Sequence, residues 1–140
     1  MYDVLLFLHV LAAFATVTVV VLLTTVAVGI SGAGTATTPL LRLSGLARRL
    51  WDVAGLGTLV FGIWLALYVD GYGLLDGWII GAIVLWIVAA GAGTRVGQAF
   101  LEASEGGGDL SALSRTRTLH IVMAVSVAAL LIVMIYKPGA

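Results

Sequence analysis

Few side chains of this chain could do chemistry, and the most conspicuous is a histidine inside a long apolar run. His9 lies in LFLHVLAAFATVTVVVLLTTVAV, residues 6–28. An ionisable side chain in such a run is costly to bury and tends to face protein or water. It could donate a hydrogen bond to a neighbouring helix, bind a cofactor or handle protons. Ala12, Ala13 and Thr16 follow on its helical face and leave room for a flat group or a close helix.

A second histidine, His120, raises the possibility of two axial ligands on one haem iron. It stands at the start of the last apolar run, which is expected to be antiparallel to the first. Counting the helical rise places the two histidines roughly 15–20 Å apart along the membrane normal. One iron cannot bond both, and His120 is more simply an interfacial histidine. Met134 is the in-chain candidate whose depth comes close to that of His9. His9 could also be a lone ligand, or pair with its copy in a dimer.

Other kinds of site find no support in the sequence. The chain has no cysteine, which excludes disulfides, thiolate ligands and c-type haem attachment. It has no glycine-rich phosphate loop, no metalloprotease helix motif and no pair of carboxylates within an apolar run. We therefore predict no catalytic residues, and a formal net charge of zero gives no reason to expect a nucleic-acid partner.

The elements that position His9 follow from composition. Of the 140 residues, 61% are hydrophobic and 10% charged, with a mean hydropathy of +1.17. A soluble domain of this size could not bury that much apolar surface. Four runs are long enough for a ~30 Å hydrocarbon core, at about residues 4–29, 53–69, 78–96 and 118–136. The sequence therefore predicts one all-α domain, residues 1–140, an integral membrane four-helix bundle in the lipid bilayer.

The segment between the first two runs has its own pattern. TTPLLRLSGLARRLW carries leucines at helical spacing with arginines between them, after Thr38 as a plausible N-cap and Pro39 at the first helical position. This predicts a short amphipathic helix lying in the membrane interface.

The charges predict an orientation. All six arginines lie in or beside the two connections on one side, and Lys137 is the only basic side chain on the other. They are Arg42, Arg48, Arg49, Arg95, Arg115 and Arg117. Because positive charge marks the cytoplasmic side, both termini are predicted to be extracytoplasmic.

Small residues predict how the helices meet. In the second run, Ala54, Thr58, Gly62 and Ala66 recur every four residues. Such stripes allow close backbone packing in lipid. Ala89, Gly93 and Gly97 form a similar set in the third run, as do Ala124 and Ala128 in the fourth. These stripes would build the bundle of one chain, and a homodimer seam is the alternative.

The sequence also resembles a known group. LLFLHVLAAF, GLGTLVFGIWLAL and LLIVMIYKPGA resemble small bacterial membrane proteins of unknown function, related to the copper-resistance protein D family and to HemJ-type protoporphyrinogen oxidase. The resemblance implies the bacterial inner membrane and b-type haem at His9, with Lys137 near the outer end of the site. The chain departs from that family at TVTVV and RTRTLH, which weighs against the oxidase activity itself.

Two function classes remain. The first is a haem b protein that handles electrons or porphyrin, with His9 as metal ligand and Met134 and Lys137 as further cofactor-binding residues. The second is a non-enzymatic subunit for assembly, transport or conduction, acting through helix packing with copies or other membrane subunits. The near absence of polar residues along the apolar runs weakens the channel version of this class.

Overall fold

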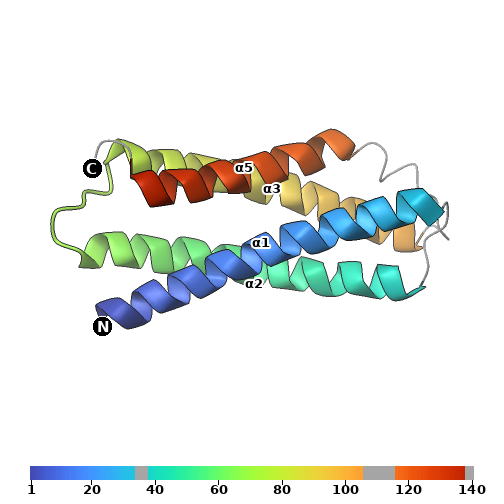
Figure 1. Cartoon of the computed structure of the whole chain (residues 1–140), viewed down its shortest axis with the longest axis horizontal. Helices are drawn as coiled ribbons and strands as arrows, with labels where there is room; N and C mark the ends of the chain where they lie inside the picture. The colour runs from blue at the N-terminus through green and yellow to red at the C-terminus, as the bar shows by residue number, and fades with distance from the viewer. Residues whose placement is uncertain (34–37, 106–115, 138–140) are drawn as a thin grey trace.

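The computed structural model describes residues 1–33, 38–105 and 116–137. The described residues form four helices (Figure 1), which are α1 (Tyr2–Ala33), α2 (Thr38–Tyr68), α3 (Gly77–Glu105) and α5 (Arg117–Tyr136). All four are long and apolar enough to cross a membrane. The predicted all-α, four-helix architecture is confirmed at this level.

The helices form two pairs. α1 packs mainly against α2, and α3 mainly against α5, while α2 and α3 make fewer contacts and α1 and α5 fewest. Both termini and the turn between α2 and α3 lie at one end of the bundle (Figure 1), which we call the terminal end. The other end, where α2 and α5 begin, is the arginine end.

The predicted separate interfacial helix is not confirmed. Its residues form the first turns of α2, which runs without a break from Thr38 to Tyr68. The sequence between the two predicted helices contains no proline, and Trp51 at that point is 7% exposed. Because Trp51 is anchored in the core, the chain has no reason to bend there. α3 also extends past the predicted limit at residue 96, to Glu105.

The bundle is best packed in its arginine half. Its buried cluster joins all four helices and comprises Val19, Val20, Leu23, Val26, Ala47, Trp51, Ala89, Ala92, Val96, Phe100, Met123 and Val127. Here the Trp51 indole lies directly on the Cα of Gly93, where an added Cβ would overlap the ring. Gly93 is therefore the position that lets a large aromatic ring enter between α2 and α3.

The small stripe of α2 packs within the chain. A Cβ at Gly57 would lie 3.3 Å from Ala12 Cβ, and a Cβ at Gly62 would touch the ring of His9. The hydroxyls of Thr16 and Thr58 lie 3.3 Å apart across the same seam. Close approach of α1 and α2 thus depends on small residues on both helices.

The predicted stripe on α5, Ala124 and Ala128, packs within the chain only in part, and a homodimer seam at these residues stays a prediction. Ala128 is exposed, and the buried side chains of this helix are Met123, Ser126, Val127 and Leu130. Nearly every residue of α5 is apolar, so its rotation is set by the shape of α3 rather than by its own pattern.

Candidate functional site

A large hollow lies between the two helix pairs toward the terminal end. It has a volume of about 560 Å³, within the range of about 300–1,000 Å³ usual for small-molecule sites. The walls are mostly apolar, and all four helices contribute to them. His9, Met134 and Lys137, the three predicted cofactor-binding residues, all line this large cavity.

His9 is held by α2 in a defined orientation. Its Nδ1 lies 3.0 Å from the backbone carbonyl oxygen of Thr58. Because a carbonyl can only accept, Nδ1 carries the proton and donates it. The ring can approach so closely because residue 62 is glycine: a Cβ there would lie 2.9 Å from Cε1 of His9.

This bond determines what the other ring nitrogen can do. With the proton on Nδ1, Nε2 of the neutral imidazole keeps a lone pair. Among the described residues, the hydrogen bond found for the His9 ring is that of Nδ1 with Thr58, and none is found for Nε2. Histidines that bind metals commonly donate their other N–H to a backbone carbonyl in this way. His9 therefore presents an oriented, unprotonated nitrogen at the cavity wall.

The terminal end of the cavity carries a cation held by aromatic rings. Nζ of Lys137 donates a hydrogen bond of 2.9 Å to the Tyr72 hydroxyl. It lies 4.9 Å from the centre of the Tyr72 ring and 5.8 Å from that of Trp78. The two rings meet edge to face, with centroids 5.3 Å apart. This arrangement keeps the ammonium group at the cavity instead of in the surroundings.

The turn between α2 and α3 places these aromatic residues. Gly71 has φ +98°, a backbone conformation that glycine adopts without strain. The Gly73 amide donates to a carboxylate oxygen of Asp76 at 2.9 Å. Tyr72 stands between these two fixed points, which directs it back over the cavity instead of away from the bundle.

Trp78 contributes an unused donor. The residue is 6% exposed and lines the cavity, yet its Nε1–H has no hydrogen-bond partner among the described residues. Buried tryptophan N–H groups usually find an acceptor, and leaving one without costs about 1–3 kcal/mol. An acceptor on a bound molecule would remove that cost.

His120 lies elsewhere. Its Nε2 is 3.1 Å from the Thr24 hydroxyl, in the arginine half. Thr24 follows His9 on α1 by fifteen residues, or about 22 Å at 1.5 Å per residue. Within the described residues, no three His, Asp or Glu side chains gather to hold a metal ion. Any metal at His9 would therefore need ligands of another kind.

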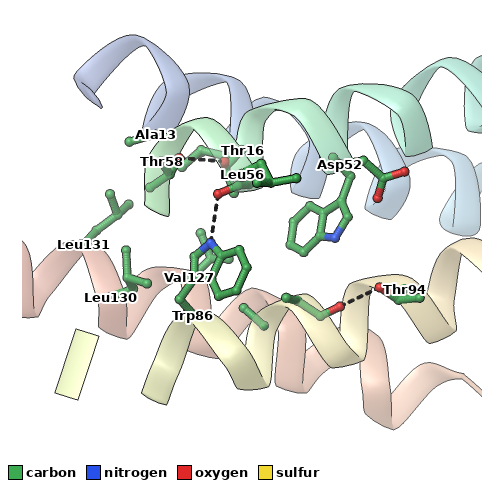
Figure 2. A pocket seen from close by; sticks show the side chains of 15 residues that line it. Ala13, Thr16, Asp52, Leu56, Thr58, Trp86, Thr94, Val127, Leu130 and Leu131 are labelled. Atoms are coloured by element: carbon green, nitrogen blue, oxygen red, sulfur yellow. Dashed lines mark hydrogen bonds between the residues drawn. The ribbon is translucent and has the colours of Figure 1, made fainter. Parts of the chain in front are cut away.

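A smaller cavity of about 280 Å³ adjoins the first (Figure 2). Thr58 and Trp86 line both. Trp86 reaches from α3 to α2 and donates from Nε1 to the Gly55 carbonyl at 3.0 Å. The Asp52 carboxylate and Thr94 stand on the arginine side of this small cavity. Trp86 is thus part of the wall that the two cavities share.

Comparison with known proteins adds no relative. No protein family, curated protein or solved structure matches this chain. The candidate site therefore depends on its own geometry.

Several contributors to the cavity were not predicted as site residues. Tyr72 and Trp78 were not predicted to belong to the site, and Gly62 and Thr58 were predicted only as packing positions. The spacing of Thr58 and Gly62, one helical turn apart, puts the carbonyl and the open backbone on one face. The sequence shows this spacing, but it does not show that the two residues contact His9.

Proposed function

We propose that this chain is a multi-pass protein of a bacterial plasma membrane that binds haem b in the large cavity, with His9 as an axial ligand. Four helices able to cross a membrane and six arginines on one side support the membrane assignment. The positive-inside rule then puts the arginine end in the cytoplasm and both termini outside.

One observation carries the haem proposal: the 3.0 Å hydrogen bond from Nδ1 of His9 to the Thr58 carbonyl. It orients the ring, selects the tautomer and leaves Nε2 free to bind iron. A histidine that served only to join two helices would need nothing more than this bond. A cavity of about 560 Å³ beside it has no role in helix packing and requires a separate explanation.

The residues around the cavity fit this group. The apolar walls suit a macrocycle, and Lys137 provides a cation for a carboxylate at the terminal end. The thioether of Met134, on the opposite helix pair, is a candidate sixth ligand. The resemblance of LLFLHVLAAF and LLIVMIYKPGA to proteins related to the HemJ type would imply His9 and Lys137 at such a site, and does not bear on Met134.

Haem b, when bound, supplies an iron centre that exchanges single electrons. The chain's own residues would hold and orient it: His9 through Nε2, Thr58 through its bond to His9, and Lys137 through its charge. The chain departs from the oxidase family at TVTVV and RTRTLH. These departures favour electron or porphyrin handling over the oxidation of protoporphyrinogen.

The absorption spectrum of the purified protein tests this function. Protein from haem-replete membranes should show a Soret band, and His9→Ala should lose it while remaining folded by circular dichroism. His120→Ala is the matched control and should keep the spectrum, because His120 bonds to Thr24 in the other half. Met134→Leu should change a low-spin spectrum to high-spin if sulfur is the sixth ligand.

Two results would overturn the proposal. One is colourless wild-type protein from haem-replete membranes, and the other is loss of the Soret band in His120→Ala alone. In the first case the non-enzymatic membrane subunit becomes the better interpretation, and His9 is a buried hydrogen-bond donor.

A further inference from the structure

The large cavity opens on one side only. Its lining residues on α2 and α3 are all buried or half-buried. On α1 and α5, in contrast, exposed side chains also line the cavity: Tyr2 is 43% exposed, Val10 41%, Phe14 69% and Ile135 73%. A side chain that faces both the cavity and the outside marks its rim. The opening is therefore a slot between α1 and α5.

The packing explains why a slot forms there. In the arginine half, Val19 and Leu23 of α1 share the core cluster with Met123 of α5, and Thr24 bonds to His120. The second cluster, at the terminal end, consists of Ala66, Trp78 and Ile79 with Tyr72, Ile83, Val133 and Met134 around them. It contains no residue of α1. Accordingly α1 diverges from α5 toward the terminal end (Figure 1).

Below Tyr2, which stands at the terminal end, the rim is apolar and lies at membrane depth. Val10 and Phe14 follow Tyr2 by eight and twelve residues, which corresponds to about 12 and 18 Å along the helix. These depths fall within a ~30 Å hydrocarbon core if Tyr2 lies at its surface. An opening toward water at this depth would need polar side chains, whereas Val10, Phe14 and Ile135 are apolar and the polar groups of His9, Trp78 and Lys137 lie inside the cavity.

We infer that the occupant of the large cavity enters sideways from the outer leaflet of the bilayer, through the slot between α1 and α5. The occupant is a membrane-dissolved amphiphile with an apolar body and an anionic or hydrogen-bond-accepting end. The apolar body of the molecule moves past the apolar side chains of the rim. Its polar end then binds to the Lys137 ammonium group and to the N–H of Trp78. The inference rests on the proposed function for the identity of the molecule and for the leaflet, but the position of the slot depends only on the cavity.

Quenching of tryptophan fluorescence tests the route without haem. Trp78 and Trp86 line the cavity, whereas Trp64 is 49% exposed and lines neither cavity. The full chain carrying Trp64→Phe, expressed without haem, is placed in vesicles of phosphatidylcholine with brominated acyl chains. The bromolipid should quench its fluorescence relative to unbrominated vesicles, and aqueous iodide should quench much less.

Two matched variants locate the path. Val10→Phe narrows the rim and should lose part of the bromolipid quenching. Val60→Phe adds the same ring on an exposed part of α2, away from both cavities, and should lose none. Stronger quenching by iodide than by bromolipid, or equal losses in both variants, would overturn the inference. No step of this experiment needs haem. Colourless protein would therefore refute the proposed function, and the quenching experiment would still test the route.

Discussion

The imidazole of His9 lies against the backbone of Gly62, so that a Cβ at that glycine would be 2.9 Å from Cε1 and 3.2 Å from Nδ1. Gly62 is one turn from Thr58, whose carbonyl accepts the Nδ1–H. One helix face thus supplies both the hydrogen-bond acceptor and the space for the ring. The orientation of the candidate ligand depends on a residue that has no side chain.

We predict that Gly62→Ala displaces His9. In an ordinary helix interior the change from glycine to alanine is favourable by roughly 0.5–1 kcal/mol. Here the added methyl group forces the ring away from the Thr58 carbonyl, and overpacking typically costs about 1–3 kcal/mol. Thermal unfolding in detergent should show a lower Tm, and the Soret band should weaken.

Gly45→Ala is the control on the same helix, because nothing lies within 4 Å of a Cβ at Gly45. It should leave the Tm unchanged or raise it. If the two alanine variants unfold at the same temperature and bind haem equally, Gly62 does not position the histidine.

A second prediction concerns the contact of α2 with α3. Gly93→Ala would place a methyl group inside the Trp51 indole, whereas Gly91, two residues earlier, has open space. Gly93→Ala should destabilise the protein by about 1–3 kcal/mol, and Gly91→Ala should not. Unfolding temperatures of the two variants check this, and a Gly93→Ala protein as stable as wild type would contradict the packing.

Sequence reasoning located the helices because an apolar run long enough to cross a membrane can satisfy its backbone hydrogen bonds there as an α-helix. It misjudged the start of α2, since the arginines between residues 42 and 49 resembled a separate surface helix. Nothing in the sequence showed that Trp51 would anchor that segment against Gly93. Tertiary packing decided whether the helix continued.

The candidate site was accessible to sequence reasoning only in part. Counting residues from the helix ends gave similar depths for His9 and Met134, and the family resemblance implied Lys137. All three line one cavity. The Thr58 carbonyl could not be predicted as a partner, because backbone acceptors have no sequence pattern. Tyr72 reaches the cavity through a turn whose path depends on Gly71 and Asp76, and no helical periodicity describes that path.

The orientation in the membrane yields a third prediction. Leu75, in the turn at the terminal end, is 87% exposed, and Glu102 is exposed near the end of α3. The chain has no cysteine of its own, so each position can carry a single reporter. A membrane-impermeant maleimide should label Leu75→Cys in intact cells and Glu102→Cys only after permeabilisation, because arginine-rich connections stay in the cytoplasm. The reverse pattern would invert the topology.

A fourth prediction separates the charge of Lys137 from its backbone conformation. Lys137 ends α5 in a left-handed conformation, φ 42° and ψ 60°, with its amide bonded to the Val133 carbonyl. Asparagine tolerates this conformation better than most residues, so Lys137→Asn should keep the helix end while removing the ammonium group from Tyr72 and Trp78. Stability should change by no more than about 1 kcal/mol, the value of an exposed cation–π contact.

The affinity for haem should respond much more strongly than stability. A hydrogen bond to a charged group is worth about 1.5–3 kcal/mol, so Lys137→Asn should weaken binding on the order of 10- to 100-fold. Lys137→Arg keeps the charge and should retain most of the affinity. Titration of haem-free protein, followed at the Soret band, measures both variants. Equal weakening in Lys137→Asn and Lys137→Arg would mean that the shape of the lysine matters and its charge does not. Unchanged affinity in both would place the anionic end of the ligand away from Lys137, leaving the Trp78 N–H and the tyrosine hydroxyls as the polar groups at that end of the cavity.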